Sequence, residues 1–191
     1  MYISGEVVVA HDKKLQRLTG VEKSINELDF AQLPPLSPSV SIDFCPGEVF
    51  CDTSVMEEER KFATLGDVLT KFPSTQVNID LKDKDVALVE KVNKIIVDNR
   101  AEGSSPVAVE ISCLIHHLIE RCVWGNFNSS TTELCYSTNP KVGLLFSSLQ
   151  FIKLYLLFYT GLLPFVTIKE THLEIPMPSV FLNDKYRTSK I

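Results

Sequence analysis

The chain has 191 residues, of which 45% are hydrophobic, and a formal net charge of −5 at pH 7. This length and apolar content suffice for one sizeable core with a small appendage. The acidic balance argues against a general nucleic-acid-binding protein, which usually carries a basic stripe. The chain has five cysteines and no Cys-x-x-Cys pair, so we expect a reduced, intracellular setting.

The first predicted element is a short β-branched strand, Glu6–Ala10, which ends directly before His11 and Asp12. Too few residues precede it to form an earlier strand. The segment Val40–Arg60 shows no periodicity, and we expect an irregular surface segment there.

The next predicted element is a helix whose start has capping-box spacing, with Thr64 at the cap and Asp67 three residues later. The later elements are, in order, a strand over Gln76–Lys82, a helix capped by Asp83 or Asp85, a strand at Cys122–Trp124, a helix from Ser129 or Ser130, a strand over Val142–Phe146, a helix over Leu149–Tyr159 and a strand over His172–Met177. This alternation predicts βα units around a parallel sheet.

The apolar stretch Val142–Ile168 is interrupted by Lys153 and Pro164. Its longest uncharged run is shorter than the roughly 20 residues that span a bilayer. We therefore expect a buried strand and helix, or a helix that lies on a membrane surface. The N-terminus has no basic region followed by an apolar run, so we expect no signal peptide.

The strand Gln76–Lys82 carries the clearest chemical pattern. Side chains of a strand alternate between its faces, so Asn78, Asp80 and Lys82 share one face and the apolar residues share the other. In a barrel the polar set would point inward, near the strand ends where such enzymes place their sites. An edge strand with a solvated face fits the same spacing.

Two further candidates stand at strand positions. His11 can exchange protons near neutral pH, and it follows an apolar strand directly. The alternative is a surface His11-Asp12 pair that caps a loop. Glu174 is a carboxylate in an otherwise apolar strand, and it would face either a barrel interior or solvent. Cys113, with the histidines at 116 and 117, has no closing pair nearby, so zinc is not predicted.

Several segments together resemble the glycerophosphodiester phosphodiesterases, because they carry the family's motifs in the family's order. These segments are Gly5–Asp12, Leu15–Gly20, Thr64–Leu69 and Val77–Lys82. Three others resemble the animal membrane-associated branch, which acts on lysophospholipid-type substrates: Val123–Asn126, Gly161–Val166 and Glu174–Ser179.

The resemblance implies a TIM barrel that hydrolyses glycerophosphodiesters or lysophospholipids with Mg²⁺ or Ca²⁺ and two histidines as acid and base. His11 matches the second histidine, Asp80 a metal-holding carboxylate that is usually Glu in the wider family, and Lys82 a cation near the phosphate. The resemblance also implies a cytoplasmic location or one peripheral to the endoplasmic-reticulum membrane. Leu149–Phe158 is the segment that would touch the membrane.

The sequence also departs from the family pattern. A strand with His-Arg, a strand with Glu-x-Asp and the closing strands with a tryptophan are absent, and a TIM barrel needs about 250 residues. We therefore expect an α/β fold, an incomplete TIM barrel that lacks the first and the closing strands. It would occupy residues 1–182, with an insertion at 103–120 and a polar tail at 183–191.

Two functional hypotheses follow. The first is a phosphoric diester hydrolase of lipid metabolism that works by metal-assisted acid-base hydrolysis. The alternative is a catalytically inactive fragment, or a non-catalytic binding or membrane-associated protein. General acid-base catalysis contributes about 10²–10⁴ in rate, and one of the family's two histidines is missing. We therefore expect no measurable hydrolysis by this chain.

Overall fold

The computed structural model describes residues 1–42, 47–98 and 119–175. Its centre is a parallel sheet in the order β5 (Val77–Asp80), β6 (Cys122–Gly125) and β7 (Gly143–Leu144). A parallel bridge between Leu145 and His172 adds a further neighbour beyond β7. The predicted α/β fold with a parallel sheet is thus confirmed in the described part of the chain. Closure into a barrel stays a prediction.

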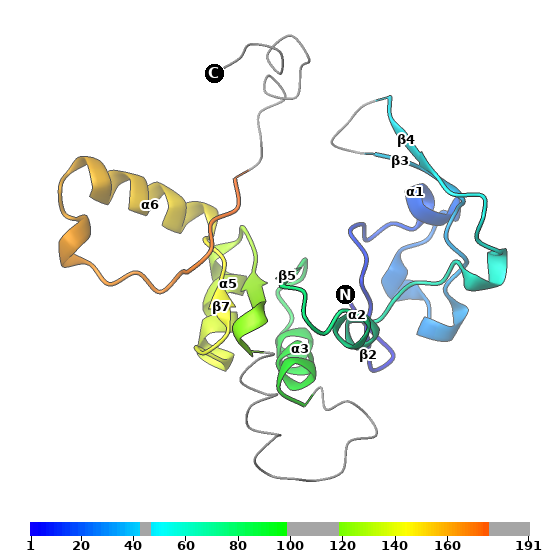
Figure 1. Cartoon of the computed structure of the whole chain (residues 1–191), viewed down its shortest axis with the longest axis horizontal. Helices are drawn as coiled ribbons and strands as arrows, with labels where there is room; N and C mark the ends of the chain where they lie inside the picture. The colour runs from blue at the N-terminus through cyan, green and yellow to red at the C-terminus, as the bar shows by residue number, and fades with distance from the viewer. Residues whose placement is uncertain (43–46, 99–118, 176–191) are drawn as a thin grey trace.

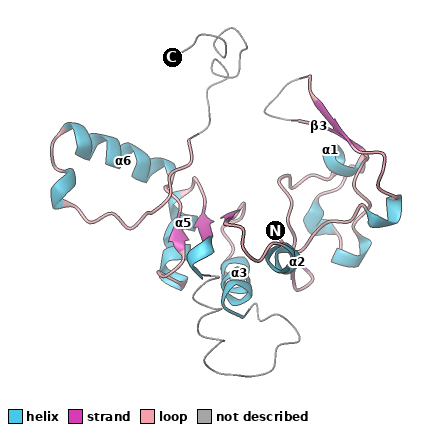
Figure 2. Cartoon of the chain, viewed as in Figure 1, coloured by secondary structure: helices cyan, strands magenta, loops and turns pink. Residues whose placement is uncertain are grey.

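Each strand of this sheet is followed by a helix, as the alternation predicts (Figure 2). The helices are α3 (Val86–Asp98), α5 (Ser129–Thr138) and α6 (Ser148–Tyr159). Asp85 accepts a hydrogen bond from the Ala87 N–H at the start of α3, at 2.9 Å. A preceding helix, α2 (Leu65–Lys71), begins with the predicted capping box of Thr64 and Asp67. Local capping therefore accounts for where these helices begin.

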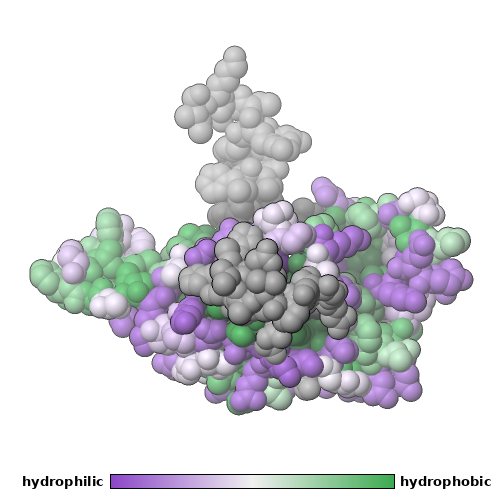
Figure 3. Space-filling view, turned by 60° about the horizontal axis from the view of Figure 1, so that its bottom comes forward, coloured by the Kyte–Doolittle hydropathy of each residue, from purple (hydrophilic) through white to green (hydrophobic). Residues whose placement is uncertain are grey.

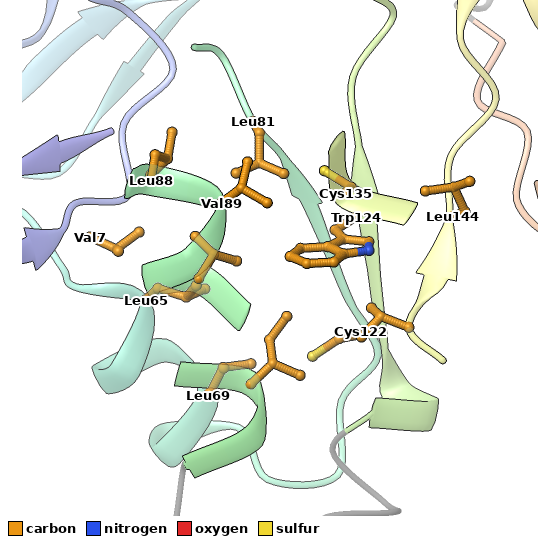
Figure 4. Close-up of a cluster of buried hydrophobic side chains, with 13 residues drawn as sticks. Val7, Leu65, Leu69, Leu81, Leu88, Val89, Cys122, Trp124, Cys135 and Leu144 are labelled. Atoms are coloured by element: carbon orange, nitrogen blue, oxygen red, sulfur yellow. The ribbon is translucent and has the colours of Figure 1, made fainter. Parts of the chain in front are cut away.

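The main core lies between the sheet and its helices (Figure 4). Trp124 is fully buried at its centre, beside Leu81 from the end of β5 and Val89 from α3. Val77 and Ile79 pack against the same core. The alternate residues of β5, Asn78 and Asp80, therefore point away from the helices, to the opposite face of the sheet.

The opening strand does not join this sheet. β2 (Glu6–Val7) pairs antiparallel with β1 (Tyr2–Ile3), and Val8 forms an antiparallel bridge with Thr64. The expectation that too few residues precede this strand to form an earlier one is therefore wrong. The reason is a tight turn, since Ser4 (φ 48°) and Gly5 (φ 92°) adopt left-handed conformations that fold the first residues back onto the strand.

The segment expected to be irregular contains an antiparallel hairpin of β3 (Ser39–Ser41) and β4 (Val49–Cys51). Three-residue strands are too short for an alternating pattern to be recognised. A second core underlies this region and contains Ile3, Val8, Leu15, Ile25 and Phe62. The remaining elements are short: α1 (Gln16–Thr19) and the 3-10 helices η1 (Ile25–Glu27), η2 (Phe30–Gln32), η3 (Glu57–Glu59) and η4 (Leu163–Phe165).

Some sequence predictions fall outside the described residues. They are the tail at 183–191, residues 103–118 of the proposed insertion, and Cys113 with the two histidines that follow it. Of the strand predicted to start at His172, the described part shows the single bridge at His172 itself. Among the described helices, none has both the length and the apolar character needed to cross a bilayer.

Candidate active site

Polar side chains meet where the parallel strands end. Asp80 is the last residue of β5, and Asn126 follows β6 directly. The Asn126 side-chain amide donates a hydrogen bond to Oδ1 of Asp80 at 2.7 Å, and the Lys82 ammonium donates to Oδ2. Because the carboxyl ends of parallel strands share one edge, this edge carries a carboxylate, an amide and a cation within contact of one another.

Glu174 reaches the same face from the other side of the sheet. The Asn78 side-chain amide donates a hydrogen bond to Oε1 of Glu174. Glu174 also lines a shallow depression together with Asp80 and Asn126. The structure therefore brings Asn78, Asp80, Lys82 and Glu174 together on the face of β5 that points away from the helices.

The backbone at Gly125 holds Asn126 in place. Gly125 has φ +152°, and a Cβ built there would lie 2.8 Å from the Cβ of Leu145. A glycine is needed for β7 and its extension to approach β6 this closely. The Thr132 hydroxyl then donates to the Asn126 carbonyl at 2.7 Å, and it accepts from the Asn126 N–H at 3.2 Å. These contacts fix the amide that faces Asp80.

His11 is exposed, with 68% of its side chain accessible, and it has one protein partner in the described contacts. Its Nδ1 lies 2.7 Å from Oδ1 of Asp12. The other Asp12 oxygen accepts from Nε of Arg17 at 2.6 Å. The hydrogen bond from Arg17 lowers the pKa of Asp12, with a further contribution from His11. An ionised Asp12 therefore orients the imidazole and leaves Nε2 directed outward.

The segment that carries His11 lies beside the end of β5. Val9 and Ala10 line a pocket of about 140 Å³ together with Asp80 and Lys82. The Lys13 ammonium forms an ion pair with Asp83, just after β5. Among the described residues, no hydrogen bond or ion pair joins His11 itself to Asp80. The residues just before His11, and not His11 itself, therefore lie across this pocket from Asp80 and Lys82.

The donor set provides part of a metal site. Asp80 and Glu174 offer carboxylate oxygens, which are the ligands that Mg²⁺ and Ca²⁺ prefer. Both Asp80 oxygens, however, already accept hydrogen bonds from protein side chains. Within 1–42, 47–98 and 119–175, no three His, Cys, Asp or Glu side chains gather closely enough to hold a metal ion. These residues alone do not fit a complete metal centre.

Two residues of this arrangement were not predicted from the sequence. Asn126 could have been found, because it follows a buried strand directly and parallel strands place such residues at one edge. Arg17 gave no local signal. Its contact with Asp12 arises because the chain turns back through α1 after the opening strand.

Comparison with known proteins adds an independent observation. Residues 4–141 match the model of the glycerophosphoryl diester phosphodiesterase family, and this match contains His11, Asp80, Lys82 and Asn126. Lysophospholipase D GDPD1 of Homo sapiens is 35% identical over 185 residues, which cover 94% of this chain and 50% of the human protein. Lysophospholipase D GDPD3 of Mus musculus is 32% identical over 176 residues, 92% of this chain and 47% of the mouse protein. The chain spans about half the length of the curated relatives it matches.

Proposed function

Because the chain belongs to the glycerophosphoryl diester phosphodiesterase family, we propose that its site serves the hydrolysis of phosphodiesters in lipid metabolism. The proposed substrates are glycerophosphodiesters and lysophospholipids, in line with the lysophospholipase D names of the relatives. The observation that carries the proposal is the pocket between the His11 segment and β5, where Asp80 and Lys82 lie across from Val9 and Ala10.

In this proposal Lys82 and His11 act on the phosphodiester group of the substrate. A phosphodiester is negatively charged and gains charge in the transition state, so the Lys82 ammonium stabilises it. His11 exchanges a proton with the leaving oxygen through Nε2, while Asp12 keeps the imidazole oriented. Asn78 and Glu174, joined by a hydrogen bond, lie beside Asp80.

Divalent-metal dependence is general in this family. A bound Mg²⁺ or Ca²⁺ would polarise the phosphoryl oxygen and neutralise its charge. Asp80 would supply one oxygen ligand to it. Since the described residues alone do not fit a complete centre, we propose that this chain by itself binds either ion weakly. Saturable Ca²⁺ binding in calorimetry that is lost in Asp80→Asn would contradict this.

A second candidate function is lipid binding without hydrolysis by the 191-residue chain. The incomplete metal donor set among the described residues favours it. So does the placement of His172, which contacts Thr171 and Gln76 rather than the Asp80 edge. General acid-base catalysis normally contributes about 10²–10⁴ in rate and needs both a proton donor and an acceptor in reach.

One assay separates the two candidates. The chain is incubated with glycerophosphocholine or lysophosphatidylcholine in Mg²⁺ or Ca²⁺. The release of choline is measured, together with glycerophosphate from the first substrate or lysophosphatidate from the second. We expect no measurable turnover. Turnover that disappears in His11→Ala and in Asp80→Asn, and persists in the exposed control Lys84→Ala, would establish the hydrolase instead.

The membrane contact and the location are also part of the proposal. α6 is covered with exposed apolar side chains, and Figure 3 shows hydrophobic surface at the end of the molecule that α6 occupies. We propose that Leu149–Phe158 lies on a lipid surface, peripheral to the endoplasmic-reticulum membrane or facing the cytoplasm. The free thiols of Cys51, Cys122 and Cys135 support a reducing intracellular compartment.

A further inference from the structure

A second, larger pocket of about 620 Å³ opens beside His11, and neither proposed function accounts for it. Its walls are mostly apolar and include Leu18, Leu36, Val40 and Phe50. This volume lies in the range of about 300–1,000 Å³ that small-molecule sites occupy. The pocket is separate from the one beside Asp80 and Lys82, and His11 stands at its edge.

The walls are held by hydrogen bonds within the protein. The Ser37 N–H donates to the Leu18 carbonyl, and the Leu36 N–H donates to the Arg60 carbonyl, both at 2.7 Å. Nη1 of Arg17 donates to the Ser41 carbonyl at 2.8 Å, which ties β3 to α1. The apolar wall is therefore preformed, and a ligand need not order it on binding.

The rim of the pocket includes the side chain of Arg60. Nε of Arg60 is buried and has no hydrogen-bond partner among the described residues. Its Nη2 lies 3.9 Å from the exposed Glu57 carboxylate, at the limit of an ion pair. Because protein atoms close Nε off from solvent, a ligand in the pocket meets the exposed part of the Arg60 side chain and its positive charge. Lys61 adds a second positive charge to the same lining, which also contains the carboxylates of Asp52 and Glu59.

We propose that this pocket binds the single acyl chain of a lysophospholipid. Arg60 then meets an oxygen of the glycerol or ester group, and the anionic phosphate lies toward His11. The apolar wall matches the acyl chain and the charged rim matches the polar end of such a molecule, whereas a glycerophosphodiester without an acyl chain makes no contact with the apolar wall. The inference rests on the proposed function for its substrate class, and it adds the place where the chain is recognised.

The test is direct binding to the full 191-residue chain by calorimetry, without metal and without turnover. The probes are lysophosphatidylcholines of increasing chain length below their micelle concentrations, with glycerophosphocholine as the matched compound that lacks a chain. We expect affinity to rise severalfold for each added pair of methylenes until the pocket is full. Glycerophosphocholine should bind at least a hundredfold more weakly than the longest probe.

Two neighbouring residues of β4 give matched variants. Phe50 lines the pocket and is 61% exposed, while Val49 is 57% exposed and is not part of its lining. Phe50→Ser should weaken lysophosphatidylcholine binding at least tenfold, and Val49→Ser should leave it unchanged. A second variant, Arg60→Met, removes this positive charge and should also weaken binding; its melting temperature is measured alongside to show that the variant is folded.

The outcomes distinguish this inference from the proposed function. Equal binding of glycerophosphocholine, or equal effects of Phe50→Ser and Val49→Ser, would overturn the acyl-chain site whether or not the chain is a hydrolase. Binding that depends on chain length and is abolished by Phe50→Ser, without hydrolysis in Mg²⁺ or in Ca²⁺, would support the acyl-chain site and exclude the hydrolase function for this chain. Hydrolysis of glycerophosphocholine without any preference for an acyl chain would support the hydrolase function and overturn the acyl-chain site.

Discussion

Asn78 on β5 donates a hydrogen bond to Glu174, which follows the bridge at His172 on the far side of β7. Neighbouring strands lie about 4.8 Å apart, so in a flat sheet these two positions would be separated by roughly 14 Å. Their contact means that the sheet is curled, with the side chains of Asn78 and Asp80 on the inner face. This curvature is what a barrel wall requires, and it gathers the candidate site on the concave side.

The pair of Asp12 and Arg17 should give a pH-dependent contribution to stability. The pKa of Asp12 is lowered in the folded chain, chiefly by the hydrogen bond from Arg17. Its stabilisation is therefore present above the unfolded pKa of about 4, and it is lost as the pH falls through the lower folded value. Asp12→Asn should lower the free energy of unfolding by about 1–2 kcal/mol at pH 7.

Urea denaturation at pH 7 and at pH 3 measures this effect. The difference between Asp12→Asn and the unmodified chain should shrink at the lower pH. Glu22→Gln is the control, since Glu22 is exposed, and it should change the free energy by less than about 0.5 kcal/mol. A difference for Asp12→Asn that grows toward pH 3 would contradict the assignment.

Gly125→Ala should destabilise the fold and disturb the site. The new Cβ would lie 2.8 Å from that of Leu145, at a φ of +152° that L-residues rarely adopt. Strain and overlap of this kind cost about 2–4 kcal/mol. Urea denaturation should show this loss, whereas Gly66→Ala within α2, where the Cβ meets only Thr64 at 3.8 Å, should stabilise by about 0.5–1 kcal/mol. Equal effects of the two variants would argue against close packing of β6 and β7.

Cys135 should resist alkylation in the folded chain. Burial raises the pKa of its thiol to about 12, so hardly any thiolate forms near neutral pH. Cys51 is exposed and free. Iodoacetamide at pH 8 should modify Cys51 and spare Cys135 until the chain is unfolded, as peptide mass spectrometry can show. Modification of both cysteines at the same rate in native conditions would show that Cys135 is not buried on α5.

The exposed apolar surface of α6 should bind lipid vesicles. Leu156 and Phe158 are 59% and 64% exposed, so their loss removes apolar contact with lipid without removing core packing. The double variant Leu156→Ser with Phe158→Ser should weaken binding to phosphatidylcholine–phosphatidylserine vesicles at least tenfold in co-sedimentation. Phe72→Ser with Val86→Ser is the matched control, because both residues are exposed and apolar but lie at the ends of other helices, Phe72 just after α2 and Val86 at the start of α3. Equal weakening by both pairs would mean that α6 is not the contact.

Local features could be predicted from the sequence because neighbouring residues decide them. The capping box at Thr64, the alternating faces of Gln76–Lys82 and the order of strands and helices depend on spacing along the chain. The motifs around His11 and Asp80 likewise pointed to the family that the comparison shows. Their proposed roles in catalysis stay predictions.

The sequence by itself determined the α/β class, the helix starts and the polar set of β5, since each depends on short-range periodicity or capping. Tertiary structure alone decided that Asn78 meets Glu174, that Asn126 holds Asp80, and that β3 and β4 wall an apolar pocket beside His11. Those contacts join residues far apart in the chain. They depend on how the sheet curls and where loops return, which no local pattern specifies.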